Sequence, residues 1–180
     1  MKKSIIIIAA IFMTAFTTNV MAQNGATISA NSSATSEIIT PLSIMKTQDM
    51  NFGKLAVLAG VPGTCILTTA ATRTPGGGVN LSNSTPTNSI FAVAGESSRN
   101  YAITLPSTIT VTGPSGSSPM QIDNLKLITT DLQAERSAPT TSTIDGSGAD
   151  QITVGGTLNV AGNQAKGSYT GPFTITIAYN

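Results

Sequence analysis

Apolar and polar residues alternate along the stretch GSYTGPFTITIAYN (167–180). From residue 169 onward the large apolar side chains share one parity, whereas mainly threonine and alanine occupy the other. A period of two residues is typical of a half-buried β-strand, because successive side chains of a strand point to opposite faces of the sheet. The pattern predicts a strand that runs to residue 179. Because chain ends fray unless something holds them, we expect this strand to be held in a sheet.

Further strand-like runs precede this stretch, and turn-forming residues lie between them. The runs cover residues 36–44, 50–59, 63–69, 78–82, 89–96, 100–106, 107–113, 120–130 and 151–160. Glycine and proline gather in the gaps, for example in VPG (61–63), TPGGG (74–78) and GPSG (113–116). Short strands at regular spacing, separated by turns rich in glycine and proline, predict an all-β fold, either a sandwich or a barrel.

The same pattern predicts the core and the irregular segments. Residues 129–138 could form one or two turns of helix, residues 137–150 are polar and aperiodic and predict a surface loop, and PGGGVN (75–80) predicts a turn. The predicted core consists of Phe52, Leu55, Leu67, Phe91, Val93, Ile103, Leu105, Leu125, Leu127, Val154, Leu158, Phe173, Ile175 and Ile177.

The beginning of the chain has the pattern of a secretory signal peptide. Lys2 and Lys3 are followed by an apolar run over residues 5–13, and Val20-Met21-Ala22 offers a cleavage site. We expect a signal peptide (1–22), an N-terminal extension (23–35) and one β-sandwich domain (36–180). The protein would be exported through the periplasm to the cell surface or the medium, without membrane insertion after signal cleavage.

The charge balance argues against nucleic acid as a partner. Without Lys2 and Lys3, seven basic residues stand against eight acidic ones, and no basic cluster occurs. The single cysteine, Cys65, cannot form an internal disulfide and lies in the alternating run GTCILTT (63–69). We interpret it as a small buried apolar residue rather than as an intermolecular bridge.

The sequence offers little for catalysis. It contains no histidine, which removes the usual Ser-His-Asp and Cys-His arrangements and the commonest zinc ligand. Asp145 and Asp150 are the closest candidates for an acid–base pair, but DGSGAD (145–150) is more typical of a solvated turn and lacks the alternating ligands of a calcium loop. We therefore expect no enzyme activity, no metal site and no cofactor.

The alternating stretch also resembles the C-terminal signature of chaperone–usher pilus subunits. In that signature a glycine and a penultimate aromatic residue bracket the final strand, and Gly167 and Tyr179 stand at these positions. The resemblance implies an antiparallel immunoglobulin-like, pilin-like β-sandwich that is completed by a strand from elsewhere, and a periplasmic chaperone that recognises the terminal strand. The residues assigned to this terminal assembly site are Gly167, Tyr169, Phe173, Ile175, Ile177 and Tyr179.

The chain after the signal peptide resembles a bacterial exported family of unknown function that is related to spore-coat-protein-U-like and fimbrial β-sandwiches. Five segments carry this resemblance in order. They are ITPLSI (39–44), DMNFGKL (49–55), FAVAGESSRNYAITLP (91–106), ITVGGTLNV (152–160) and the stretch from residue 167 to 180.

These resemblances leave two functions open. The first is a structural subunit of a surface appendage or coat, whose partners are other copies or related subunits and whose donor strand would come from residues 23–35, with Ala26, Ile28 and Ala30 on one face. Only Ile28 among these three is large, so a flexible leader on a self-contained domain is equally compatible. The second function is a secreted adhesin or glycan-binding module that uses loops such as 73–88 or 137–150.

Overall fold

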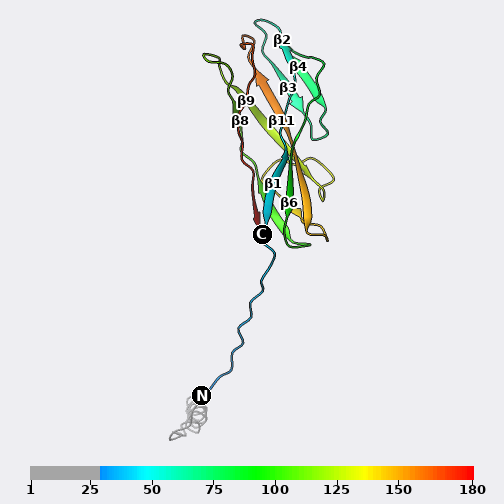
Figure 1. Cartoon of the computed structure of the whole chain (residues 1–180), viewed down its shortest axis with the longest axis vertical. Coiled ribbons are helices and arrows are strands. Elements are labelled where there is room, and N and C mark those ends of the chain that lie inside the picture. Colours follow the sequence, from blue (N-terminus) through cyan, green and yellow to red (C-terminus); the bar gives the residue numbers. More distant parts are fainter. Residues whose placement is uncertain (1–28) are drawn as a thin grey trace, which may run out of the picture. The chain divides into compact units, whose positions relative to one another are not determined.

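Antiparallel β-strands build the whole of the regular structure in the computed structural model, which describes residues 29–180 (Figure 1). Residues 29–37 form no helix or strand and are exposed, and residues 38–180 form a separate unit. The predicted signal peptide lies outside the described residues. Within residues 29–180, no helix is long and apolar enough to cross a membrane.

The larger sheet has seven strands arranged around the long strand β11 (Ala149–Val160). On one side β11 pairs with β6 and then with β3, and on the other side with β9. The outer positions belong to β1 beside β6, β4 beside β3 and β8 beside β9. The bounds of these strands are β1 (Ser43–Gln48), β3 (Gly63–Leu67), β4 (Arg73–Gly77), β6 (Ser89–Ala94), β8 (Ile109–Val111) and β9 (Met120–Thr129).

Two smaller sheets cover the inner face of the larger one. The first has the order β10-β7-β12, and the second is the pair β2 and β5. Their bounds are β2 (Leu55–Val57), β5 (Val79–Leu81), β7 (Asn100–Thr104), β10 (Thr140–Thr143) and β12 (Thr176–Tyr179). Side chains of both layers share common clusters, so the prediction of an all-β antiparallel sandwich is confirmed.

A bulge at Gly155 and Gly156 divides β11 into two halves. Opposite these glycines the register with β9 shifts, and Asn124 of β9 takes a positive φ of 46°. A side chain at Gly155 would meet the backbone carbonyl of Leu67 in β3, so only glycine allows β3 to approach here. The bulge is the point at which β11 exchanges its partner β6 for β3.

The core accordingly consists of two clusters, one on each half of β11. One cluster centres on Cys65, Leu67 and Leu158, and the other on Tyr101, Ile103 and Ile152. Ten of the predicted core residues are buried, and the remaining four are partly buried against these clusters. The buried ones are Phe52, Leu67, Phe91, Val93, Ile103, Leu125, Leu127, Val154, Leu158 and Ile175; the partly buried ones are Leu55, Leu105, Phe173 and Ile177.

Three predictions about irregular segments are wrong. Residues 129–138 contain the end of β9, bends and a single bridge instead of a helix, because the backbone of Arg136 pairs with Leu127 of β9. The predicted loop 137–150 contains β10 and the start of β11, since its hydroxyl-rich residues pair with β7. The predicted turn at residues 75–80 is largely strand, since β4 runs to Gly77 and β5 begins at Val79, and Pro75 is tolerated because β4 lies at the edge of the sheet.

We expect Gly155→Ala to lower the free energy of unfolding by about 1–3 kcal/mol, because the new methyl group meets a backbone carbonyl that cannot rotate away. Gly146→Ala is the matched control, since a methyl group there meets no atom within 4 Å. Urea unfolding of both variants measures the difference. Equal midpoints for the two variants would contradict a close approach of β3 and β11.

Candidate functional site

Strand β12 pairs with a neighbour on one side only. Its partner is β7, with Tyr179 opposite Tyr101. The Asn180 N–H donates to the Asn100 carbonyl at 3.3 Å, and the bonds of an antiparallel pair alternate along each strand. The backbone groups of Ile177 and Tyr179 therefore point away from β7. They lie along an edge that no other strand in the described part of the chain occupies.

The side chain of Tyr179 fastens this strand to the residues that precede β1. Its hydroxyl donates to the Thr40 carbonyl at 2.9 Å and accepts from the Glu96 N–H at 2.6 Å. The Glu96 carboxylate accepts from the Thr40 N–H at 2.7 Å, and this bond lowers the pKa of Glu96. The Arg99 guanidinium lies 5.7 Å from the centre of the Tyr179 ring. We call this group the Tyr179 clasp.

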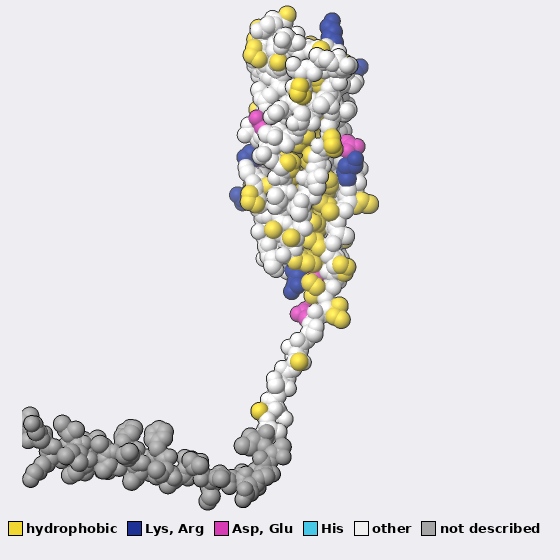
Figure 2. All heavy atoms as spheres, turned by 90° about the vertical axis from the view of Figure 1, so that its left-hand side faces the viewer, with side chains coloured by type: hydrophobic (Ala, Val, Ile, Leu, Met, Phe, Trp, Pro, Cys, Tyr) yellow, Lys and Arg dark blue, Asp and Glu magenta, His cyan; other side chains and the backbone are white. Residues whose placement is uncertain are grey.

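Apolar side chains of the terminal segment join the second core cluster. Ile175 is buried, and the Phe173 ring meets the Phe91 ring edge to face at 6.0 Å between centres. Residues in and next to β1, which pairs with β6 alone, pack on the same cluster. Figure 2 shows apolar side chains gathered in a lengthwise stripe on the side that carries the C-terminal segment in Figure 1. The partly buried residues that we call the terminal seam are Leu42, Ile44, Met50, Phe173, Ile177 and Tyr179.

The structure splits the terminal residues that the sequence grouped together. Ile175 belongs to the second cluster, and the partly buried Phe173, Ile177 and Tyr179 pack against it. Tyr169 packs against the first cluster instead, and Gly167 is exposed beside Pro114.

The predicted strand is also shorter than expected. Regular pairing covers only β12, because Pro172 has no N–H to donate and Gly171 lies against the backbone of Thr110. Among the candidate donor residues, Ala30 is exposed and outside any strand. Ala26 and Ile28 lie outside the described residues.

The other edge strands of the two larger sheets carry features that discourage pairing with another chain. β1 has the exposed Lys46, β4 has Pro75, and β8 is covered by a bridge between Thr112 and Thr170. β10 consists only of threonine and serine. β12 likewise has no charge, no proline and no bridge along its free edge, but unlike β10 it carries the large side chains of Ile177 and Tyr179, which makes it the unprotected apolar edge of these sheets.

Sequence reasoning placed Asp145 and Asp150 together in a solvated turn, and this is correct only for Asp145. That carboxylate is exposed and accepts hydrogen bonds from Ser147 and Ala149, which lower the pKa of Asp145. Asp150 is buried, so the two carboxylates have different surroundings. Within residues 29–180, no group of three acidic, cysteine or histidine residues could hold a metal ion.

Asp150 is the centre of a buried polar network that the sequence did not reveal. Its carboxylate accepts from the Tyr101 hydroxyl at 2.7 Å, the Ser142 hydroxyl at 2.8 Å and the Thr130 N–H at 3.0 Å. The Ser142 hydroxyl also bonds that of Thr129 at 2.6 Å. The network ties β7 and β10 to β11 and so fixes the strand on which β12 pairs. The sequence does contain one signal for this network: an acidic residue, Asp150, follows shortly after the hydroxyl-rich segment TTST (140–143) that forms β10.

Cys65 is fully buried in the first cluster and free, which confirms its interpretation as a small buried apolar residue. Burial raises the pKa of its thiol, an effect that Arg73 partly opposes. A buried thiol with a raised pKa is a poor nucleophile.

The fold and its terminal edge define an all-β, antiparallel sandwich domain with one unprotected apolar edge strand. The chain belongs to the family described as a domain of unknown function (DUF4402), which matches residues 42–179. No curated protein and no solved structure matches the chain. The prediction of an unknown-function family is confirmed, whereas its relation to spore-coat and fimbrial proteins stays a prediction.

We expect Ile175→Ala to lower the free energy of unfolding by about 2–5 kcal/mol, because it removes a buried side chain of the second cluster. Thr174→Ala, at the neighbouring exposed position, should leave stability nearly unchanged. Denaturant unfolding compares the two. If both variants unfold like the wild type, the terminal segment does not belong to the core.

The Tyr101 network predicts a loss of stability in strong base. Burial, and then the hydrogen bond to Asp150, raise the pKa of Tyr101 above its usual value of about 10. The stabilisation from this group is therefore fully present below about pH 10 and is lost as the pH rises further. We expect the urea midpoint of the wild type to fall more steeply above about pH 10 than that of Tyr101→Phe. Parallel pH profiles would contradict this role of Tyr101.

Proposed function

We propose that the chain is a non-catalytic structural subunit of a bacterial surface appendage or coat, in which a strand from a neighbouring subunit pairs with the free edge of β12. One observation supports this function above all: β12 is an apolar edge strand that is paired on one side and lacks the features that protect the other edges. Such an edge is a template for an incoming strand, whose backbone would bond with Ile177 and Tyr179.

Residues 23–35 of another copy are the proposed incoming strand. An extended strand rises about 3.3 Å per residue, so this segment could run along all of β12. Its candidate inward side chains, at Ala26, Ile28 and Ala30, are mostly small. Small side chains suit a seam whose own apolar residues already pack against the core, and main-chain hydrogen bonds would then supply most of the attraction. A related subunit could supply an equivalent strand.

The proposed function requires export of the chain to the cell surface. A signal peptide would send the chain into the periplasm, where the unprotected β12 edge would be open to wrong pairing. We propose that a periplasmic chaperone covers the edge until assembly, as the resemblance to pilus subunits implies. The assembled protein would then stand at the cell surface.

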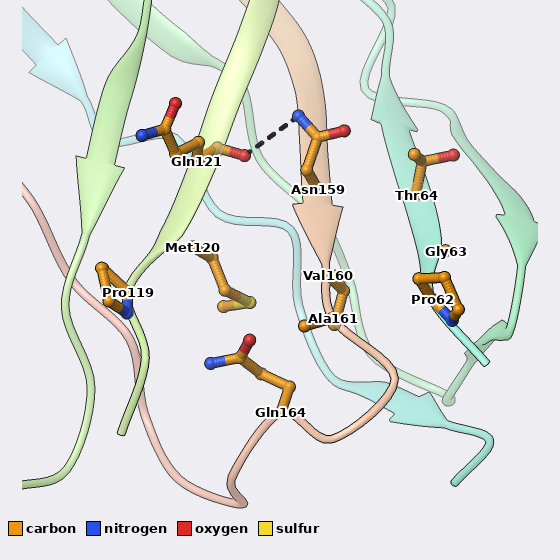
Figure 3. Close-up of a pocket in the computed structure, with 10 residues that line it drawn as sticks. All are labelled: Pro62, Gly63, Thr64, Pro119, Met120, Gln121, Asn159, Val160, Ala161 and Gln164. Atoms are coloured by element: carbon orange, nitrogen blue, oxygen red, sulfur yellow. Dashed lines mark hydrogen bonds between the residues drawn. The ribbon is translucent and has the colours of Figure 1, made fainter. Parts of the chain in front are cut away.

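A self-contained secreted adhesin or glycan-binding module is the alternative function. It is favoured by a separate hollow in the described surface, which Figure 3 shows at the ends of β9 and β11. The two loops proposed from sequence, 73–88 and 137–150, do not line this hollow.

The proposed pairing can be tested with a change that removes a single edge donor. Ile177→Pro deletes the N–H that points away from β7 and leaves the bonds to β7 intact. Ile177→Ala is the matched control, since it shortens the same side chain but keeps the N–H. Sedimentation and electron microscopy of residues 23–180 should show fibres or ladders for the control and mostly monomers for the proline variant.

Equal assembly of the two variants would contradict pairing at this edge. A clean monomer for the wild type would contradict the subunit function itself and favour the alternative.

The proposed donor is tested separately. Ile28→Asp should block assembly of residues 23–180, because it places a charge among the apolar residues of the seam, and the monomer should unfold at the same temperature as the wild type. Size-exclusion chromatography and thermal melting measure the two properties. Unchanged assembly would show that residues 23–35 are a leader and not the donor strand.

A further inference from the structure

A hollow of about 540 Å³ opens where β9 begins and β11 ends, beside the start of β3 (Figure 3). In Figure 1 this end of β11 lies opposite the end at which the C-terminus is marked. The volume falls within the range of roughly 300–1,000 Å³ that is usual for small-molecule sites. Its lining consists of Pro62, Gly63, Thr64, Pro119, Met120, Gln121, Asn159, Val160, Ala161 and Gln164.

The polar side chains of this hollow are the neutral amides of Gln121, Asn159 and Gln164 and the hydroxyl of Thr64, and one of the amides is held in a fixed orientation. The amide nitrogen of Gln164 donates to the Ser118 carbonyl at 2.6 Å and to the Tyr169 hydroxyl at 2.8 Å. Both of its hydrogens are thereby used, and its oxygen remains as an acceptor. The Tyr169 hydroxyl in turn donates to the Ala165 carbonyl at 2.9 Å, which holds the whole arrangement in place.

Asn159 offers a second oriented acceptor. Its amide nitrogen donates to the backbone carbonyl of Gln121 at 3.4 Å, so its side-chain oxygen faces the other way (Figure 3). The exposed side chain of Gln121 adds an amide that can both donate and accept. The hollow therefore combines two oriented acceptors with one adaptable amide.

Apart from the Thr64 hydroxyl, the remaining side chains of the lining are apolar, and none carries a charge. Met120, Val160, Pro62 and Pro119 provide the apolar surface, and no acidic or basic residue takes part. An ionic ligand would lose its hydration here without gaining an ionic partner. A purely apolar ligand would leave the oriented amide oxygens without partners when it displaced their water.

We propose that this hollow binds a neutral saccharide. The hydroxyl groups of a sugar would donate to the amide oxygens of Gln164 and Asn159, and its C–H faces would pack on Met120 and the prolines. Because no aromatic ring lines the site, each contact is weak. A surface that presents many copies would compensate through multivalency, although the site itself does not depend on assembly.

The test uses ¹⁵N-labelled chain 23–180 and neutral probes, namely methyl β-D-galactoside, methyl α-D-mannoside, N-acetylglucosamine and chitobiose. At least one probe should shift the amide signals of Gly63 and Ala161 in a saturable manner, with a millimolar Kd. Asn159→Ala should weaken that Kd at least tenfold, and Gln121→Ala should weaken it severalfold. Asn83→Ala, an exposed amide outside the hollow, is the control and should bind like the wild type.

Thermal melting of each variant separates a lost contact from a lost fold, and the exposed Gln121 provides a variant that leaves the core untouched. The proposal is overturned if none of the four probes shifts these signals up to about 50 mM. It is also overturned if folded Asn159→Ala and Gln121→Ala bind as tightly as the Asn83→Ala control. Tighter binding of the anionic probe 3′-sialyllactose than of every neutral probe would contradict the assignment to a neutral saccharide.

Discussion

The pairing of β12 with β7 is the interaction on which the second layer of the sandwich depends. β7 is the middle strand of three, and its Tyr101 and Ile103 are fully buried, so it needs a neighbour on each side. β10 provides one neighbour and the chain returns after residue 170 to provide the other. This return brings Ile175 into the core and places the Tyr179 clasp at the end of the strand. The layer closes over the core, but its last strand keeps a free edge.

The bulge in β11 separates the edge proposed for assembly, at β12, from the hollow proposed for saccharide binding. Gly155 and Gly156 bend the central strand and divide the core into two clusters. β12 closes the cluster at one half of β11, whereas the amide-lined hollow lies beyond the other half. An incoming strand at β12 would therefore leave the hollow open. The proposed subunit and the proposed saccharide site are compatible in one molecule.

Alternation in the sequence was sufficient to predict most strands and most of the core, because a half-buried strand must place its apolar residues at every second position. It failed for β10 and β4, and it predicted a strand at residues 36–44 where the structure has β1 at Ser43–Gln48. In β10 the inward residue is Ser142, and its hydrogen-bond partner Asp150 lies in β11 of the other sheet, so only the folded chain brings the two together. In β4, Pro75 and its glycines resemble a turn and become a strand only because β3 lies beside them.

The candidate site was predictable only in part for the same physical reason. The apolar side chains from Phe173 to Tyr179 are a local signal, and they do lie together on one cluster. The contact of Tyr179 with Thr40 joins residues 139 positions apart, and no local pattern contains it. The amide-lined hollow likewise combines β3, β9 and β11, so the pairing of these strands had to be known first.

Amide hydrogen exchange of residues 36–180, alone and with a synthetic peptide of residues 23–35, tests the open edge most directly. We expect slow exchange at Ala178, whose N–H faces β7, and fast exchange at Ile177 and Tyr179, whose N–H groups face the free edge. Added peptide should slow exchange at Ile177 and Tyr179 and leave Ala178 unchanged. Slow exchange at all three residues without peptide, or no change when peptide is added, would contradict an open edge that accepts this strand.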